Sequence, residues 1–468
     1  MRKITKRILA GIMSAATLAS FAACADDGDG GGGGGAVATT ETTTERTEWT
    51  GDNIEVTAAE ELDTSVDISG KTLKWLGFYD LNPTNSSPER SVEVALFEDT
   101  YGAKIEWIET THDKRFDDLA TSIIGGTPPD IFVLEDRTFP YDVSKGQYQA
   151  IDSLVDWNDP MWAEMKATAD KFTWQGEHYV APLGYGFNDY QLLMYDEDMV
   201  EEEGLDDPYE LYEKNEWDWD NFLRLQKEFQ DGGDDRYGIV GWWANAFVAT
   251  SGDTLVTYDG NKFINNLLSP NVERAQGVIK EMVDQNLIDA GDWGDPSQAF
   301  VNGNHLFYAM GTWALNQAAD KVPDHHIKVV PFPRNPNTDT YYMGKRLLAY
   351  MWVKGSENGD VVKAWFDVNR IANSDPQYIE LNKQKFLSND DASHWTEDVY
   401  DTVLSFSDDS VIAYSFDYGV GISDVMTGDN GYVRTLYEIM IKDEDPNWTR
   451  SREEYYSIFD AELEPFNS

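Results

Sequence analysis

The chain has 468 residues, of which 41% are hydrophobic and 13% aromatic, enough for a sizeable core and two or more domains. Its 36 Lys and Arg residues stand against 85 Asp and Glu residues, which gives a formal charge of −49. A surface this acidic repels phosphate backbones and anionic lipids, so we expect no nucleic-acid partner and no direct attraction to a membrane. The single cysteine excludes an internal disulfide framework.

Residues 1–23 have the pattern of a secretory signal peptide. Four basic residues precede an uncharged run at 8–21, which is shorter than the roughly 20 apolar residues of a membrane span. Two alanines form the cleavage point, and Cys24 follows them directly. This order resembles the lipobox of bacterial lipoproteins, whose cysteine carries a diacylglycerol anchor, although Phe21 stands where leucine is commonest. The alternative for Cys24 is a free thiol in an ordinary secreted protein.

Residues 24–67 are expected to form a flexible tether. Gly30 to Gly35 is an uninterrupted glycine run, and a threonine- and glutamate-rich stretch continues to Thr50. This composition buries too little apolar surface to offset the conformational entropy lost on folding. The tether would hold a folded domain, which we expect to start near Ile68, away from the membrane.

Beyond the tether, strand and helix patterns alternate along the chain. The first half predicts a strand at 71–80, a helix at 87–102, a strand at 103–110, a helix at 113–126 and a strand at 129–135. The second half repeats this order less regularly, with helices expected near 218–230, 271–286, 358–373 and 451–460. Such alternation predicts an α/β fold with largely parallel sheets.

Motifs of common enzyme and cofactor classes are missing. The chain has no G-x-G-x-x-G after a strand, no G-x-x-x-x-G-K-[ST], no G-x-S-x-G and no H-E-x-x-H. His325 and His326 are adjacent rather than at helical ligand spacing, so a surface loop is expected there, and the acidic cluster at 231–235 lacks the residue order of a calcium loop. The motifs therefore give no argument for an enzyme, although they do not exclude one, and we expect no catalysis, no cofactor and no metal.

Several stretches resemble, in the family order, the extracellular solute-binding proteins of ABC importers, in the carbohydrate-binding group that includes maltose-binding protein. They are YGAKIEWI, GGTPPDIFVLED, HYVAPLGYGFNDYQLLMYDEDMVEEEGL, EWDWDNFLRLQKEF, AFVNGNHLFYAMGTWAL and VVPFPRNPNTDTYYMGKRLLAYMWVKGSENGDVVKAWFDVNRI. The resemblance runs from about Leu73 to Ala372 and is poor beyond about Asn389. Asp196 and Asp218 replace the asparagine and threonine that the family usually has at these points.

The resemblance implies the two-lobe fold of periplasmic binding proteins, with a hinge between two α/β lobes. We assign 68–184 and 344–392 to lobe one, and 185–343 and 393–468 to lobe two. It also implies a monomeric, lipid-anchored receptor on the extracellular face of the cell membrane. Such a receptor captures a carbohydrate, expected here to be an oligosaccharide, by lobe closure and delivers it to the transmembrane subunits of an ABC permease.

The chemistry of sugars indicates which side chains to seek. Aromatic rings suit the C–H face of a sugar, and planar polar groups suit its hydroxyl edge. Ligands of open sheets bind beyond the carboxyl ends of strands. The candidates at such places are Trp313; Trp242, Trp243 and Asn245; Glu135, Asp136 and Arg137; Tyr79, Asp80 and Asn82; and Tyr185 and Asp189 near the lobe crossing. Adjacent side chains on extended backbone point to opposite faces, so one of Trp242 and Trp243 is expected to face the ligand.

Two other functions stay open at this point. A lipoprotein glycosidase would use the same cleft with two carboxylates about 5–9.5 Å apart. A receptor for a peptide or polyamine would also fit, and a polyamine would suit the negative charge. The identity, linkage and length of a bound sugar do not follow from the sequence.

Overall fold

The computed structural model describes residues 62–84, 89–186, 191–289, 298–344, 346–388, 393–427, 431–432 and 448–468. The leader, Cys24, most of the expected tether and Asp189 lie outside these residues. The folded part begins earlier than Ile68, because Leu62 is buried in the core and the Tyr101 hydroxyl donates to the Asp63 carbonyl (3.3 Å). Among the described residues, no helix combines the length and the apolar character that a membrane crossing requires.

Six strands form the first sheet in the order β2–β1–β3–β15–β4, with β7 also paired to β15. They are β1 (Thr72–Gly77), β2 (Lys104–Glu109), β3 (Ile131–Val133), β4 (Tyr148–Gln149), β7 (Ala181–Gly186) and β15 (Arg346–Val353). The accompanying helices are α1 (Val92–Tyr101), α2 (Arg115–Ile124), α3 (Pro160–Ala163), α4 (Lys166–Ala169), α11 (Gly359–Ala372) and α12 (Pro376–Leu387). Helix α11 is almost wholly buried and packs against α1, β1 and β7.

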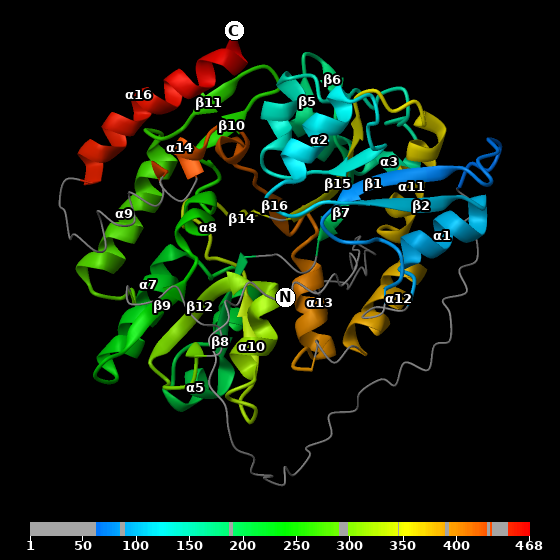
Figure 1. The fold of residues 1–468 in the computed structure, drawn as a ribbon. Helices are drawn as coiled ribbons and strands as arrows, with labels where there is room; N and C mark the ends of the chain where they lie inside the picture. Colours follow the sequence, from blue (N-terminus) through cyan, green and yellow to red (C-terminus); the bar gives the residue numbers. More distant parts are fainter. Residues whose placement is uncertain are drawn as a thin grey trace, which may run out of the picture.

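Four strands form the second sheet in the order β13–β8–β12–β9, well separated from the first in Figure 1. They are β8 (Gln191–Asp196), β9 (Tyr237–Gly241), β12 (His305–Gly311) and β13 (Ile327–Val330). The helices of this part are α5 (Glu197–Glu202), α6 (Pro208–Glu213), α7 (Trp219–Asp231), α8 (Ala244–Ala249), α9 (Pro270–Asp284), α10 (Leu315–Ala319) and α13 (Glu397–Ser405). The two sheets confirm the α/β fold.

Both sheets are mixed rather than largely parallel, and the reason lies in the connections between them. β15 is antiparallel to β3, β4 and β7, and β8 is antiparallel to β12 and β13. Each of these two strands is the first of its sheet after the chain arrives from the other part of the molecule. The chain leaves the first sheet at the carboxyl end of β7 and enters the second sheet where β12 and β13 end. β8 therefore starts at the ends of these strands and runs antiparallel to them.

Two-stranded ribbons and the C-terminal elements complete the fold. They are β5 (Thr173–Trp174) with β6 (Glu177–His178), β10 (Val256–Tyr258) with β11 (Phe263–Asn265), β14 (Tyr341–Met343) with β16 (Ile412–Tyr414), η1 (Thr138–Asp142), η2 (Asp170–Phe172), η5 (Thr312–Ala314), η7 (Tyr418–Gly421), α14 (Asp424–Thr427) and α16 (Trp448–Asn467). Helix α16 packs on β11 and is longer than the helix expected at 451–460 (Figure 1).

The register of the strands brings particular edges together. β1, β2, β3 and β7 end at one edge of the first sheet, where β15 begins. β9, β12 and β13 end at one edge of the second sheet, where β8 begins. The chain joins these two edges directly, from Gly186 at the end of β7 to Gln191 at the start of β8. Side chains that follow these strands are therefore placed at the junction of the two sheets.

Candidate ligand-binding site

Two tryptophans stand at the carboxyl ends of neighbouring parallel strands of the second sheet. Trp242 follows β9 and Trp313 follows β12, and their exposed fractions are 47% and 45%. The Trp242 amide donates to the Ala309 carbonyl (2.7 Å), which fixes the first residue after β9 against β12. Exposed aromatic rings of this size at a sheet edge indicate a surface for a ligand.

Gly241 allows this arrangement at the end of β9. Its φ of +99° lies in the region that favours glycine, and a Cβ there would lie 2.3 Å from the Ala309 carbonyl oxygen. A side chain at this position would push the two strand ends apart. The glycine therefore lets the chain turn tightly and present Trp242 at the edge.

Trp243 belongs to the core and not to this surface. Its exposed fraction is 1%, and it lies in the hydrophobic core of the second sheet. We therefore place Trp243 outside the candidate site and keep Trp242. The physical reason is the sharp turn after Gly241, which directs one ring outward and the next inward.

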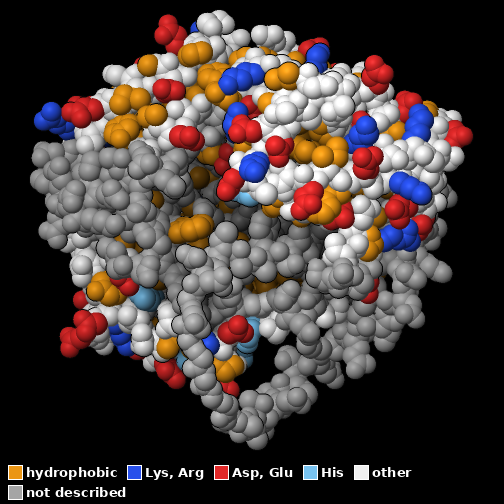
Figure 2. Space-filling model, in the orientation of Figure 1, with side chains coloured by type: hydrophobic (Ala, Val, Ile, Leu, Met, Phe, Trp, Pro, Cys, Tyr) orange, Lys and Arg blue, Asp and Glu red, His pale blue; other side chains and the backbone are white. Residues whose placement is uncertain are grey.

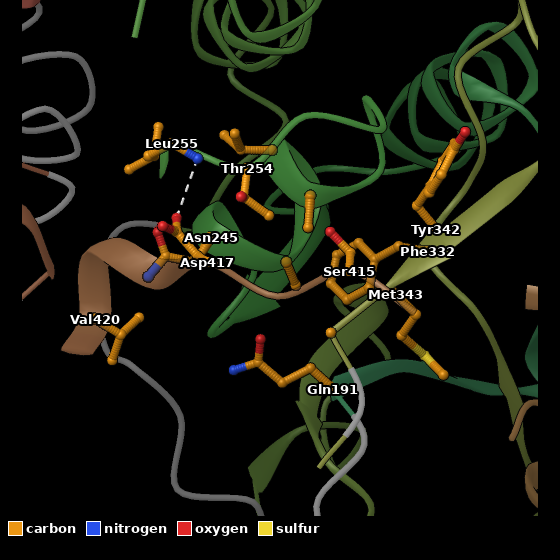
Figure 3. Close-up of a pocket in the computed structure, with 14 residues that line it drawn as sticks. Gln191, Asn245, Thr254, Leu255, Phe332, Tyr342, Met343, Ser415, Asp417 and Val420 are labelled. Atoms are coloured by element: carbon orange, nitrogen blue, oxygen red, sulfur yellow. Dashed lines mark hydrogen bonds between the residues drawn. The ribbon is translucent and has the colours of Figure 1, made fainter. Parts of the chain in front are cut away.

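A cavity of about 130 Å³ lies beside the same edge (Figure 3). Asn245 on α8 lines it, together with Gln191, which pairs with Gly311 at the end of β12. Its other walls come from β14 and the C-terminal segment and include Tyr342, Ser415 and Asp417. The cavity is smaller than the roughly 300–1,000 Å³ of typical ligand pockets, so it suits one part of a larger ligand.

Asp417 is the acidic group of this cavity, and its carboxylate is held by backbone donors. It accepts hydrogen bonds from the amides of Leu255 (3.1 Å, dashed in Figure 3), Val256 (3.1 Å) and Gly419 (2.9 Å). Burial away from solvent raises the pKa of Asp417 to about 6, although the three backbone donors act to lower it. The carboxyl group therefore titrates near neutral pH, in contact with the space that a ligand would fill.

The polar candidates after β3 are engaged in charge pairs. Arg115 binds the Glu135 carboxylate through Nε (2.6 Å) and Nη2 (2.5 Å). Arg137 lies 3.4 Å from Asp142 Oδ1, and its guanidinium stands 5.0 Å from the centre of the Phe116 ring. Asp136 is exposed. These contacts orient Glu135 and Arg137 at the edge of the first sheet, where lone pairs and N–H groups can still meet a hydroxyl-rich ligand.

The candidates after β1 form a local turn. Asp80 Oδ1 accepts from the amide (2.9 Å) and the side chain (2.8 Å) of Asn82. The Tyr79 carbonyl accepts from Trp75 Nε1 (3.0 Å), and all three candidate side chains are half-buried. The turn lies beside the end of β1, and its residues are not among those that line the cavity of Figure 3.

Tyr185 is buried at the end of β7 and does not present its ring to solvent. Its hydroxyl donates to Asp409 Oδ2 (2.8 Å) and lies 3.2 Å from Thr168 Oγ1. This bond ties the first sheet to the C-terminal segment. The side chain of Tyr185 therefore lies in a hydrogen-bonded contact at the junction, whereas Asp189 lies outside the described residues.

Of the 14 residues that line the cavity (Figure 3), only Asn245 was singled out from the sequence; the polar residues that were missed include Gln191, Tyr342, Ser415 and Asp417. Gln191 begins β8 directly after the crossing, which is a signal that could have singled it out. Ser415 and Asp417 come from the part of the chain beyond Asn389, where the family resemblance is poor. Only the folded structure brings that part to the cavity.

Comparison with known proteins places the chain in a family. Residues 85–368 match the profile of the family described as bacterial extracellular solute-binding protein. A search of curated proteins found no match.

Solved structures share the fold at low sequence identity. The sugar-binding protein MalE from Xanthomonas citri has a TM-score of 0.62 and 16% identity over 84% of this chain and 98% of its own. Lmo0181 from Listeria monocytogenes, an ABC substrate-binding protein solved with cycloalternan, has a TM-score of 0.57 and 16% identity over 83% and 99%. The GacH receptor of Streptomyces glaucescens has a TM-score of 0.56 and 15% identity over 84% and 98%. These likenesses confirm the two-lobe fold.

Proposed function

The chain belongs to the bacterial extracellular solute-binding protein family, and on that premise we propose that it is a lipid-anchored receptor for a carbohydrate. The receptor captures its ligand between two lobes and presents it to the transmembrane subunits of an ABC permease, without catalysing a reaction. An oligosaccharide is the proposed ligand class.

The observation that carries this proposal is the pair of exposed tryptophans, Trp242 and Trp313. They lie at adjacent strand ends, and the cavity with Asn245 and Gln191 lies at the same edge. Indole rings offer a large rigid face for the C–H groups of a sugar ring, and amide side chains offer donors and acceptors for its hydroxyls. Two rings and one small cavity suit a ligand longer than a single sugar.

The structural relatives support a carbohydrate ligand but not its length, since two others are described with α-D-tagatose and with a preference for β-D-galactopyranose. The Listeria protein was solved with cycloalternan, and GacH was solved with acarbose. Figure 2 shows Asp and Glu side chains spread over the described part of the visible surface, with Lys and Arg side chains among them.

The anchor and the lobe boundaries are part of the proposal. Cys24 would carry the lipid, and the glycine- and threonine-rich tether would leave the receptor free to reach its permease. We assign 68–184 and 344–392 to lobe one, extended at its start to include Leu62, and 185–343 and 393–468 to lobe two.

A thermal-shift screen over a panel of sugars tests the proposal. A ligand that binds only the folded state raises the melting temperature. At a ligand concentration about a hundred times Kd, it adds about 2.7 kcal/mol to the free energy of unfolding. We expect one oligosaccharide series to raise it and to be recovered unchanged after incubation. Shortened products would identify a glycosidase, and a response to polyamines or peptides but to no sugar would contradict the ligand class.

A further inference from the structure

The far edge of the second sheet, away from the tryptophans, gathers two carboxylates and two histidines. Asp196 ends β8 and Asp198 lies in the first turn of α5, while His325 and His326 immediately precede β13. Antiparallel pairing of Asp196 with Ile327 sets the two segments opposite each other. Potential ligand atoms of Asp196, Asp198 and His325 all lie within 4.8 Å of one another.

Hydrogen bonds hold these side chains in place. Asp196 is buried, and its Oδ1 accepts from the Met199 amide (3.3 Å) while Oδ2 lies 2.5 Å from His325 Nδ1. The His326 amide donates to Asp198 Oδ2 (2.7 Å), and His326 Nδ1 lies 3.1 Å from the same oxygen. Two backbone-anchored carboxylates and two imidazoles are therefore arranged before any ligand arrives.

This donor set matches the preferences of zinc. Zn²⁺ takes imidazole nitrogen and carboxylate oxygen in tetrahedral sites at about 2.0–2.2 Å, whereas Ca²⁺ and Mg²⁺ favour shells of oxygen alone. We propose that Asp196, Asp198 and His325 form a Zn²⁺ site on lobe two, with His326 placed to supply the fourth ligand.

The side chains have the freedom that binding needs. Ligand atoms of a tetrahedral site stand about 3.3 Å apart, given those bond lengths, so the 2.5 Å contact of His325 with Asp196 must widen by roughly an ångström. Asp196 is fixed, but the His325 side chain is 45% exposed and can move. Zn²⁺ binds a ring nitrogen that carries no proton, so a proton on Nδ1 of His325 must leave it, passing to solvent from a charged ring or moving to Nε2 in a neutral one.

The site is distinct from the candidate carbohydrate site. Gln191 at the cavity and Asp196 at the histidines are the first and last residues of β8, five residue steps or roughly 17 Å apart at about 3.3 Å per residue. α5 lies at the bottom of the view in Figure 1, below the strands that carry the tryptophans. Failure of one proposal therefore leaves the other standing.

Competition with a chromophoric zinc chelator tests the site. The full mature chain is used without a polyhistidine tag, and Cys24→Ser is present in every protein because a free thiol also binds zinc. We expect one tight Zn²⁺ per chain and at least about a tenfold loss of affinity in His325→Ala and in Asp198→Asn. His394→Ala is the matched control, because His394 also lies against a carboxylate, that of Asp320 (2.8 Å), but is outside the proposed site.

The result that would overturn the proposal is no zinc binding by the parent chain, or equal affinity in the parent, His325→Ala and Asp198→Asn. Circular dichroism of each variant checks that it is folded, and Asp198→Asn keeps the shape of the side chain if His325→Ala disturbs the strand end. Sugar binding, measured with and without Zn²⁺, is expected to be the same.

Discussion

At the scale of single residues, Trp242 and Trp243 show how one turn divides two identical side chains between surface and core. Their exposed fractions are 47% and 1%. Alternation along the backbone predicts that only one of them faces a ligand, but not which one. Which ring faces outward depends on the φ of +99° at Gly241 and on the contact of this residue with β12. Neither feature can be predicted from the sequence.

The pair gives a prediction with a built-in control. Trp242→Ala is expected to leave stability nearly unchanged and to weaken sugar binding by about thirtyfold or more, since a stacked aromatic anchor contributes 2 kcal/mol or more. Trp243→Ala is expected to lower the free energy of unfolding by about 3–5 kcal/mol through the cavity it leaves. Urea unfolding and calorimetric titration measure the two effects. A reversed pattern would place Trp243 in the site.

Asp417 predicts a pH dependence of stability. Its folded pKa of about 6 lies above the ordinary value of 3.8, so between about pH 4 and 6 the folded state binds the proton that the unfolded state has lost. The contribution of Asp417 to the free energy of unfolding therefore falls as pH rises through that window. The fall is about 2 kcal/mol, which allows for the partial exposure of the Asp417 residue to solvent.

Urea unfolding of the parent and Asp417→Asn at pH 4, 5, 6 and 7 isolates this contribution from the other carboxylates. The stability of the parent relative to the variant should shrink as pH rises. A relative stability that is constant, or that grows with pH, contradicts the raised pKa.

At the scale of elements, the sequence predicts helices well where a cap is present. Asp218 replaces the family threonine before α7, and its side chain still accepts from the Asn221 amide (3.1 Å), so the start of the helix is preserved. α1 shows the limit of this approach. The expected start at 87 was wrong, because Ser91 is the residue that caps the helix.

Helix η7 in the C-terminal segment joins the two lobes by close backbone contact. A Cβ on Gly421 would lie 2.1 Å from the Phe139 carbonyl oxygen and 2.3 Å from that of Asp136. The Tyr418 hydroxyl donates to the Lys171 carbonyl (2.7 Å), while Asp417 holds the start of β10. Gly421 therefore sets how closely this segment approaches lobe one.

Gly421→Ala is expected to lower the free energy of unfolding by about 1–3 kcal/mol and to weaken sugar binding, because rigid backbone must move beside Asp136. Gly277→Ala is the matched control. Gly277 lies inside α9 with open space around its Cβ position, so alanine should stabilise by about 0.5–1 kcal/mol and leave affinity unchanged. Melting temperature and titration calorimetry check both. Equal behaviour of the two variants would show that Gly421 does not position the lobes.

At the scale of the whole molecule, the sequence predicts the two-lobe fold because ordered family segments extend to Ala372. It does not predict how the remainder closes the structure. Asp409 meets Tyr185, and Asp417 meets Leu255, across long stretches of chain, and such contacts leave no local pattern. For the same reason the exposed tryptophan edge could be expected from the sequence, whereas the cavity walls from Ser415 and Asp417 could not.

The proposed anchor makes a prediction for the intact cell. Cys24→Ser removes the thiol that would carry the lipid, so the receptor should move from the membrane fraction to the medium or remain unprocessed. Fractionation and immunoblotting of the two forms measure this. Parent and variant that are processed alike and both stay with the membrane would contradict a lipid anchor at Cys24.

The central claim, a carbohydrate receptor whose ligand stacks on the tryptophan edge, is tested most directly by calorimetric titration of Trp313→Ala. The titrant is the sugar that most raises the melting temperature of the parent. Because Trp313 is 45% exposed, the variant should keep its melting temperature and lose at least about thirtyfold in affinity. Unchanged affinity would remove Trp313 from the site and contradict the account.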